Sequence, residues 1–348
     1  MKRIKRFIDC YVPVTTCNLR CKYCYITQNN RWGDSIPKLD YSVEHIVKAL
    51  SKDRLGGICH LNMCGGGETL LPKEMVPILK GLLEEGHYIM VVTNGTISKR
   101  FDEIIEFPKD LLNRLGFKFS FHYEELIRLN KLDEYFDNIR KIKQAGCSFS
   151  VEITPYDDLI DKIDDIKSTC LKNVGELCHV TVGRKDNDVD KPILTDYPIE
   201  EYYKIWDQFS SDLFEFKMST FNKKRNEFCY AGDWSFYLNL YTGDMSQCYC
   251  GKFTQNIYKN LHKKIKYLAI GNNCTLPHCY NSHAFLTLGV IPELDTPYYS
   301  KMRNRILQNE EEWLNKDMKE VLSNKLYKNN KQYNFIKKLA VNYKNRKL

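Results

Sequence analysis

The residues best suited to chemistry are three closely spaced cysteines near the N-terminus. Cys17, Cys21 and Cys24 form a C-x3-C-x2-C loop directly after a run of β-branched and aromatic residues. Three thiolates are suitable ligands for an iron–sulfur cluster or for zinc. A structural zinc site needs a fourth protein ligand, and no further Cys or His is adjacent to the loop. Three ligands on a four-iron cluster leave one iron open, as a catalytic centre requires.

A glycine-rich turn after the second predicted strand is the next candidate site. Gly65, Gly66, Gly67 and Glu68 occur in succession there, and glycines allow a backbone to approach a ligand closely. An ordinary glycine-rich turn between a strand and a helix would explain the same residues without a ligand. Polar residues on or after other predicted strands are further candidates: Thr93, Asn94, Ser120, His122, Glu152, Thr154 and Arg184.

The cysteine loop and the glycine turn together resemble the radical S-adenosylmethionine (SAM) superfamily. The loop includes the aromatic Tyr23 before its last cysteine, as in that family. The resemblance implies that Cys17, Cys21 and Cys24 bind a [4Fe–4S] cluster with SAM at its open iron. It implies that an electron from the cluster cleaves SAM to a 5′-deoxyadenosyl radical, which removes a hydrogen atom from an unactivated C–H bond. A flavodoxin- or ferredoxin-type protein is the implied electron donor.

The same resemblance implies SAM contacts at the strand ends. In the family a Gly-Gly-Glu at this position bonds the SAM amino group, although the family usually continues with proline where this chain has Thr69. Ser120 is expected at the ribose and Arg184 at the SAM carboxylate, with an ordinary surface arginine as the alternative. His122 is expected either to face the substrate as a catalytic residue or to be a hydrogen-bonded histidine of the barrel. The other expected contacts are Tyr23, Thr93 and Asn94.

Five cysteines form a second constellation late in the chain: Cys229, Cys248, Cys250, Cys274 and Cys279. The spacing Cys229-x13-Gly243-x4-Cys248 resembles the opening of the SPASM and twitch extensions, which follow many radical SAM domains and hold auxiliary [4Fe–4S] clusters. The number of cysteines implies the shorter twitch form with one cluster. The resemblance implies Cys229, Cys248, Cys274 and Cys279 as ligands, with Cys250 and His283 as spare or alternative ligands. The family usually places its last two ligands closer together than Cys274 and Cys279.

Other interpretations of these five cysteines stay open. Four thiolates also suit a structural zinc ion. Alternatively, the five cysteines are unrelated residues of the core. The segment 228–290 has few long apolar runs, so it needs something else to fold around. A fully Cys-ligated cluster would transfer electrons, whereas one with an open iron would anchor substrate. A further interpretation makes Cys250 a catalytic thiol that returns a hydrogen atom to the substrate radical, which gives epimerisation.

Alternating strands and helices are expected to position these residues. β-Branched or aromatic runs occupy 7–14, 58–63, 88–93, 117–122, 148–153 and 178–182, and helical periodicity occupies 43–52, 73–85, 98–106, 132–145 and 157–172. This alternation predicts parallel βαβ units of the α/β class and, without a Rossmann fingerprint, a partial (β/α)6 barrel. The chemistry of such barrels lies at the C-terminal ends of the strands.

The predicted parts of the chain are a barrel over 7–190, a helical connector over 191–227, a Cys-rich auxiliary-cluster domain over 228–290 and a basic helical tail over 291–348. One helix is expected over 199–214. From residue 301 to the end, 13 Lys and Arg stand against 5 Asp and Glu, so the tail carries the whole net charge of +8. Such a tail can bind nucleic acid or anionic lipid, but its helical spacing favours a solvated helix.

Composition narrows the class of protein. The chain has 348 residues, 43% of them hydrophobic, but no apolar run of about 18 residues that would predict a membrane span. The basic start is not followed by the apolar region of a signal peptide, so we expect a cytoplasmic protein. In a cytosolic chain of this size, 14 cysteines favour metal ligation over disulfides.

The expected function is a radical SAM oxidoreductase or epimerase acting on a small polar substrate, such as a sugar or an aminocyclitol. The alternative is a maturase of a ribosomally made peptide. Such relatives often carry an N-terminal winged-helix domain for the leader, and here the first predicted strand begins near residue 7. A remote alternative is a non-catalytic iron–sulfur or zinc regulator that binds nucleic acid. Such a regulator needs no SAM site, and the chain shows no helix-turn-helix or basic–aromatic pattern.

Overall fold

One sheet runs through the computed structural model, which describes residues 3–348. The neighbours from β6 to β7 pair in parallel, whereas β8 and β9 are antiparallel additions at one edge. The predicted α/β class with a parallel sheet is confirmed. In their order across the sheet, the strands are β6 (His179–Val180), β5 (Ser148–Ile153), β4 (Leu115–Ser120), β3 (Tyr88–Thr93), β2 (Cys59–Gly65), β1 (Arg6–Val12), β7 (Ser235–Asn239), β8 (Asp244–Ser246) and β9 (Thr254–Asn256).

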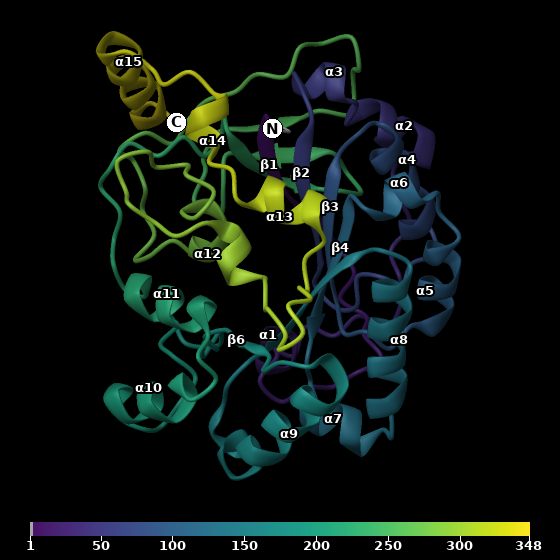
Figure 1. Ribbon diagram of the computed structural model, residues 1–348. Helices are drawn as coiled ribbons and strands as arrows, with labels where there is room; N and C mark the ends of the chain where they lie inside the picture. Colours follow the sequence, from purple (N-terminus) through teal and green to yellow (C-terminus); the bar gives the residue numbers. More distant parts are fainter. Residues whose placement is uncertain (1–2) are drawn as a thin grey trace.

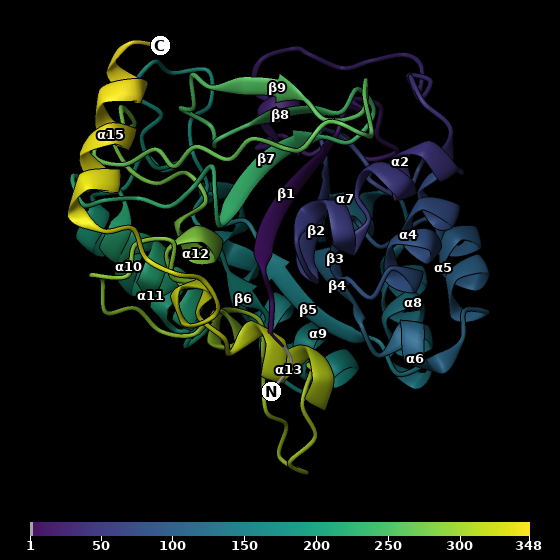
Figure 2. The same cartoon turned by 90° about the horizontal axis from the view of Figure 1, so that it is seen from above.

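Helices on the strand connections cover the outer face of the parallel strands (Figures 1 and 2). Ser42 caps α2 as predicted, because its Oγ accepts a hydrogen bond of 3.2 Å from the His45 amide. The helices of this half are α1 (Tyr25–Gln28), α2 (Val43–Ala49), α3 (Lys52–Leu55), α4 (Met75–Glu84), α5 (Ser98–Ile105), α6 (Lys109–Leu112), α7 (Tyr123–Arg128), α8 (Leu132–Gln144), the 3-10 helix η1 (Asp157–Lys162) and α9 (Ile163–Val174).

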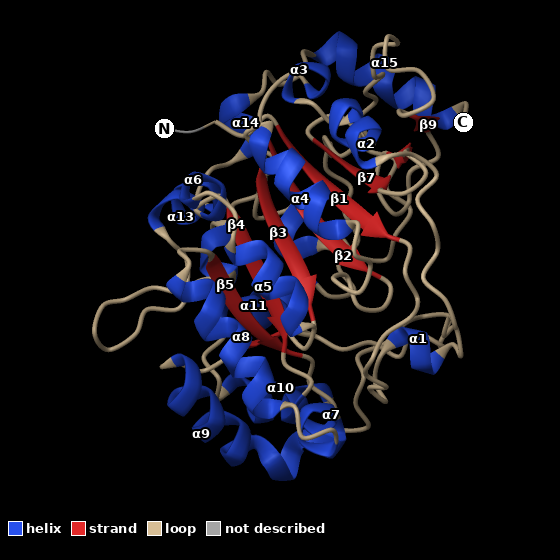
Figure 3. Ribbon diagram, turned by 90° about the vertical axis from the view of Figure 1, so that its right-hand side faces the viewer, coloured by secondary structure: helices blue, strands red, loops and turns tan. Residues whose placement is uncertain are grey.

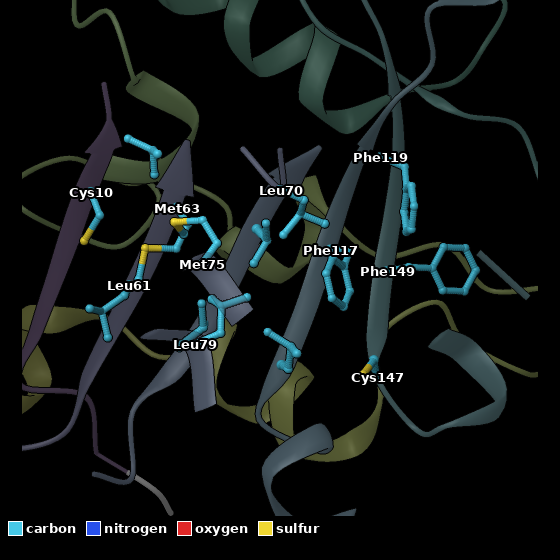
Figure 4. Packing of buried hydrophobic residues seen from close by; sticks show 14 of the residues in the cluster. Cys10, Leu61, Met63, Leu70, Met75, Leu79, Phe117, Phe119, Cys147 and Phe149 are labelled. Carbon is cyan, nitrogen blue, oxygen red and sulfur yellow. The ribbon is translucent and has the colours of Figure 1, made fainter. Parts of the chain in front are cut away.

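Alternate residues of each strand point to opposite faces of the sheet. Cys10, Leu61, Met63 and Phe117 belong to the apolar layer between the sheet and the helices (Figure 4). Their strand neighbours, among them Phe7 and Met90, belong to a second apolar cluster on the inner face. The sheet curves around this inner face, as the view from above shows (Figure 2).

The second half of the chain adds helices on the inner side and at the edge of the sheet. They are α10 (Ile199–Asp207), α11 (Asp212–Thr220), α12 (Ser282–Phe285), the 3-10 helix η2 (Tyr299–Met302), α13 (Lys316–Leu322), α14 (Leu326–Asn329) and α15 (Phe335–Arg346). The single helix expected over 199–214 is wrong: Ser210 takes a positive φ of 46°, and the Ser211 hydroxyl caps a new helix by accepting from the Phe214 amide at 3.4 Å. Figure 3 shows the two helices as separate ribbons.

The expectation of a solvated tail is wrong for residues 299–326. Trp313 is 1% exposed, and its indole donates to the Val174 carbonyl at 3.1 Å. Its carbonyl accepts from the Phe149 amide at 3.0 Å, beside β5. Met302, Met318 and Leu322 are also buried. Met302, Met318 and Leu322 therefore pack with the second apolar cluster, on the inner face, whereas Trp313 packs with the first cluster beside β5. The helix α15 keeps an exposed side.

The Cys-rich segment joins the barrel through β7. Phe7 pairs with Ser235 and Tyr11 with Asn239 in parallel register, so the main sheet continues directly into the segment that carries the late cysteines. Within residues 3–348, no helix is long and apolar enough to cross a membrane.

Candidate active site

The three N-terminal cysteines lie in one loop between β1 and α1. Cys24 is the residue before α1, Cys21 is buried, and the thiols of all three are free of disulfides. The Leu19 amide donates to Cys17 Sγ at 3.4 Å, and the Asn94 side-chain amide donates to the same sulfur at 3.6 Å. Donors that face a sulfur favour its thiolate form. The loop is therefore ordered around thiols that can bind metal.

Burial raises the pKa values of these thiols. The pKa of Cys17 rises to about 11, mainly through burial and further through the carboxylate of Glu68. Burial is also the largest cause of the raised pKa values of Cys21 and Cys24. Iron or zinc binds the thiolate, so metal binding here would release protons.

The glycine turn packs directly on the backbone that leads to Cys17. A Cβ on Gly67 would lie 2.1 Å from the Thr16 carbonyl oxygen, and a Cβ on Gly66 would lie 2.9 Å from that of Val14. The Gly67 amide donates to the Val14 carbonyl, and the Glu68 amide donates to that of Thr16 at 3.1 Å. Glycine is required here for contact with the cysteine loop. This requirement supplies a structural reason for the motif beside the expected ligand contact.

Glu68 connects the turn to the end of β3. It is 1% exposed; one carboxylate oxygen accepts from the Thr93 hydroxyl at 2.7 Å and the Leu70 amide at 2.9 Å, and the other accepts from the Asn94 amide at 2.7 Å. A carboxylate has about four acceptor positions, so one remains beyond these three donors. Asn94 also donates to the Asn18 side chain at 2.8 Å. The structure thus brings Cys17, Glu68, Thr93 and Asn94 into one hydrogen-bonded unit.

Tyr23 and His122 lie on the other side of the cysteine loop. The prediction that His122 lies on the fourth strand is wrong, because β4 ends at Ser120 and His122 precedes α7. Its Nδ1 is hydrogen-bonded to the Tyr23 hydroxyl, and burial lowers its pKa to about 4. Both residues, with Cys21 and Tyr156, line a cavity of about 220 Å³. The catalytic role of His122 stays a prediction.

Ser120 and Arg184, which were also predicted to contact SAM, make no hydrogen bond to this unit among the described residues. Ser120 ends β4 and pairs with Glu152 of β5 in the sheet register. Arg184 lies 3.5 Å from the Asp186 carboxylate and 5.1 Å from the ring centroid of Tyr280. Its carbonyl accepts from Gln28 of α1 at 3.0 Å. The roles of Ser120 and Arg184 at SAM stay predictions.

All five late cysteines lie near one another. Cys250 Sγ is 3.7 Å from Cys248 Sγ and 3.9 Å from Cys274 Sγ. Cys229 is close enough to Cys250, Cys274 and Cys279 for each of them to raise its pKa further, after the larger effect of burial. The structure therefore places Cys250 centrally and does not single out which four of the five would be ligands.

Sulfur–sulfur distances near 3.8 Å match the edge of a tetrahedral zinc site with Zn–S of about 2.3 Å. Among the residues that the structure describes, no three His, Cys, Asp or Glu side chains surround a single metal-ion position. In a [4Fe–4S] cluster each cysteine binds a different iron, so its ligands lie farther apart than those of one zinc ion. Cys250 and Cys274 also line a cavity of about 350 Å³ together with Lys252 and Arg346. This cavity lies between the late cysteines and α15.

The pairing of Arg303 with Glu152 and the buried Asp9 were not predicted from the sequence. Arg303 is 0% exposed, and its guanidinium contacts Glu152 on the inner face. Asp9 of β1 accepts a hydrogen bond of 2.5 Å from the hydroxyl of Tyr249. Tyr249 lies between Cys248 and Cys250 in the sequence. No local motif marks these pairs. The available signal for Asp9 was its place within the apolar run of β1, and Glu152 was named as a polar candidate without its partner.

Comparisons with known proteins identify the domain that carries the cysteine loop. Residues 11–169 match the family described as the Radical SAM superfamily. A curated relative, the S-adenosylmethionine-dependent nucleotide dehydratase of Lacinutrix mariniflava, is 26% identical over 206 residues, which are 55% of this chain and 42% of that protein. The GTP 3',8-cyclase of Clostridium perfringens is 25% identical over 166 residues, 45% of this chain and 49% of that protein. The matched segments thus span about half the length of these relatives.

Solved structures show the same fold. The crystal structure of SuiB from Streptococcus suis superposes with a TM-score of 0.51 at 13% identity, covering 73% of this chain and 64% of that one. The match to the family extends from β1 into α9 and includes the cysteine loop, the glycine turn and the end of β3. The chain therefore carries a radical SAM domain, the catalytic domain of a superfamily of enzymes.

Proposed function

We propose that this chain cleaves SAM reductively and removes a hydrogen atom from a C–H bond of a small polar substrate. The observation that carries the proposal is the hydrogen-bonded unit of the cysteine loop, Glu68, Thr93 and Asn94, inside a radical SAM domain. In this family a bound [4Fe–4S] cluster supplies the electron that splits SAM.

The residues of the chain have separate tasks in this proposal. Cys17, Cys21 and Cys24 hold the cluster, and the Asn94 amide orients Cys17 through its sulfur. The free acceptor position of Glu68 takes the SAM amino group, while its other positions hold the glycine turn against β3. Thr93 fixes the carboxylate through its hydroxyl. A buried, preorganised carboxylate of this kind binds a cationic amine without reorganising when SAM arrives.

The late cysteines are proposed to hold an auxiliary [4Fe–4S] cluster. Five cysteines that gather in one place, on a segment whose strand β7 continues the sheet of the SAM domain, support a metal site here. The resemblance to the twitch extension favours the cluster over the zinc ion that these sulfur separations also suit. Cys250 Sγ lies close to the sulfurs of both Cys248 and Cys274. This position favours Cys250 as a metal ligand over a thiol that returns a hydrogen atom to the substrate radical. A fully ligated cluster at this site would accept the second electron of a substrate oxidation.

A small substrate is favoured by the names of the curated relatives. They are a nucleotide dehydratase, 7-carboxy-7-deazaguanine synthases and a GTP cyclase, and each name refers to a small polar molecule. A fully ligated auxiliary cluster leads to net oxidation of the substrate. A free Cys250 thiol that returns a hydrogen atom leads to epimerisation.

The test is formation of 5′-deoxyadenosine from SAM by the anaerobically reconstituted chain with dithionite. We expect product from the wild type and none from the combined Cys17→Ala, Cys21→Ala and Cys24→Ala variant. Cys147→Ala, which alters a buried cysteine outside both constellations, is the matched control and should retain activity. Product from the triple variant at the wild-type rate would refute the assignment.

A further inference from the structure

The inner face of the sheet carries more cations than carboxylates around Lys118, the inward-facing residue that precedes Ser120 on β4. Lys118 of β4 lies in register with Ser150 of β5, and Ser120 lies in register with Glu152. Arg303 reaches this face from the segment after η2 and contacts Glu152. Lys217 reaches it from α11 and donates to the Thr181 hydroxyl at 2.6 Å. We call Lys118, Lys217 and Arg303 the inner cationic cluster.

One carboxylate faces these three cations. Burial raises the pKa of Glu152, but Arg303, Lys118 and Lys217 act against it and the net effect is a lowered pKa. Asp9, the other carboxylate of this face, is engaged elsewhere. It accepts from Asn62 at 2.8 Å, from Asn281 at 3.1 Å and from Tyr249. The cluster thus keeps a positive excess around Glu152.

Several donors of this region lack an acceptor. Arg303 is fully buried, and its Nε and Nη2 have no hydrogen-bond partner among residues 3–348. The buried Ser150 hydroxyl also has none there. Lys118 is 7% exposed, and the hydrogen bonds and ion pairs of the described chain do not include its ammonium group. An unpaired buried donor is costly, and an unpaired buried cation is more so. A buried donor without a protein acceptor requires a water, an ion or a ligand to satisfy it.

The cluster lies close to the proposed SAM site. Cys64 immediately precedes the glycine turn on β2, and its pKa is raised to about 11 by burial; Lys118 lowers it, while Asp9, Glu152 and Glu68 raise it further. Lys118 also lies in register with Val92 of β3, one residue before Thr93, whose hydroxyl donates to Glu68 at 2.7 Å. A group bound by the cluster would lie deeper along the strands than Ser120, with the rest of its molecule directed toward their C-terminal ends.

We propose that the inner cationic cluster binds an anionic group of the substrate, a carboxylate or a phosphate. The inference rests on the proposed function and specifies its substrate class. Either anion offers several acceptor oxygens to Arg303, Lys118 and Ser150, and a guanidinium pairs with such oxygens in a bidentate manner. Anchoring the charged end in this way would fix the orientation of the substrate C–H bonds relative to SAM.

The experiment is calorimetric titration of the reconstituted wild-type chain with inorganic phosphate and, separately, with malonate, at matched ionic strength. Binding of phosphate alone identifies a phosphate-bearing substrate, and binding of malonate alone identifies a carboxylate; each supports the proposal. Lys118→Met is expected to weaken binding about tenfold or more, because it removes one charged partner. Lys48→Met, on the exposed face of α2, is the matched control and should bind like the wild type.

Thermal unfolding of each variant without anion shows whether it is folded. Lys118→Met should remain folded, with an unfolding temperature close to that of the wild type, because Glu152 keeps Arg303 as its direct partner. Ser150→Ala provides a second variant, with binding expected to weaken about threefold. The proposal is overturned if neither anion binds, if both variants bind like the wild type, or if saturating SAM abolishes anion binding, since the cluster would then hold the SAM carboxylate. A wild type that binds anion but does not cleave SAM would refute the proposed function alone.

Discussion

At the residue scale, Glu68 is the side chain that joins the glycine turn to the end of β3. Its two oxygens accept from Thr93, Leu70 and Asn94, so Glu68→Gln loses one acceptor and turns an NH2 group toward a donor. We expect SAM to bind about tenfold more weakly to this variant, measured by equilibrium dialysis on reconstituted protein. Glu84→Gln, on the exposed side of α4, is the control. Equal SAM affinity in Glu68→Gln and wild type would argue against the carboxylate as a SAM ligand.

Gly67 gives a steric test of the same unit. A Cβ there would lie 2.1 Å from the Thr16 carbonyl oxygen, so Gly67→Ala must displace the backbone that leads to Cys17. We expect the variant to incorporate markedly less iron on reconstitution. Gly146→Ala is the matched control, because its φ of +96° makes alanine unfavourable by about 1 kcal/mol at the start of β5, away from the loop of Cys17, Cys21 and Cys24. Full iron content in Gly67→Ala would show that the loop tolerates the shift.

At the scale of elements, Ser211 joins β6 to α11. Its hydroxyl accepts from the Val180 amide at 3.0 Å and caps α11 through the Phe214 amide at 3.4 Å. Ser211→Ala should lower the free energy of unfolding by about 1 to 2 kcal/mol, measured by urea denaturation. Ser42→Ala removes a cap with a single partner at the start of α2 and should cost less. Equal losses in both variants would assign no structural role to the contact with Val180.

The elements of the first half were predicted well because their signals are local. Apolar alternation marks β1 to β5, and Ser42 and the glycines after α8 and α9 mark helix ends. The break between α10 and α11 was missed, since the aromatic periodicity continues across Ser210 and only the Ser-Ser pair signals a cap. The strand over 178–182 shrinks to two residues, because a strand at the edge of the sheet has one neighbour to define its length.

At the scale of the whole molecule, buried histidines make stability depend on pH. Burial, with smaller effects from Lys118 and Arg303, lowers the pKa of His60 to about 3. Between that value and its ordinary value of about 6.5, the unfolded chain binds a proton that the folded chain does not. Stability therefore falls as pH decreases from about 6.5 toward 3, at up to about 1.4 kcal/mol per pH unit for this residue.

His60→Phe keeps a ring against Phe7 and Tyr299 and removes the titration. Urea unfolding of the metal-free chain between pH 7 and pH 4.5 should show a shallower loss of stability in this variant. The exposed His262 provides the control variant His262→Phe, whose pH dependence should equal that of the wild type. An unchanged pH slope in His60→Phe would mean that His60 does not contribute.

The candidate site was predictable where it depends on short motifs and not where distant segments meet. Cys17 to Cys24 and Gly65 to Glu68 are recognisable as strings of residues, and the fold brings them together as expected. The contact between Arg303 and Glu152 joins residues 151 positions apart. Polar helical periodicity around Arg303 favoured a solvated tail, but Trp313 and its apolar neighbours bury this segment against β5. A local sequence pattern cannot predict such a tertiary contact.

We propose that the N-terminal loop and the late cysteines hold two separate [4Fe–4S] clusters. The most direct test of this claim is iron and sulfide content, with EPR, of the anaerobically reconstituted wild type and the Cys17/Cys21/Cys24 triple-Ala variant. We expect about eight irons per wild-type chain and about four in the variant, with one EPR signal lost and one retained. Equal iron content and identical EPR signals in the two proteins would contradict the claim.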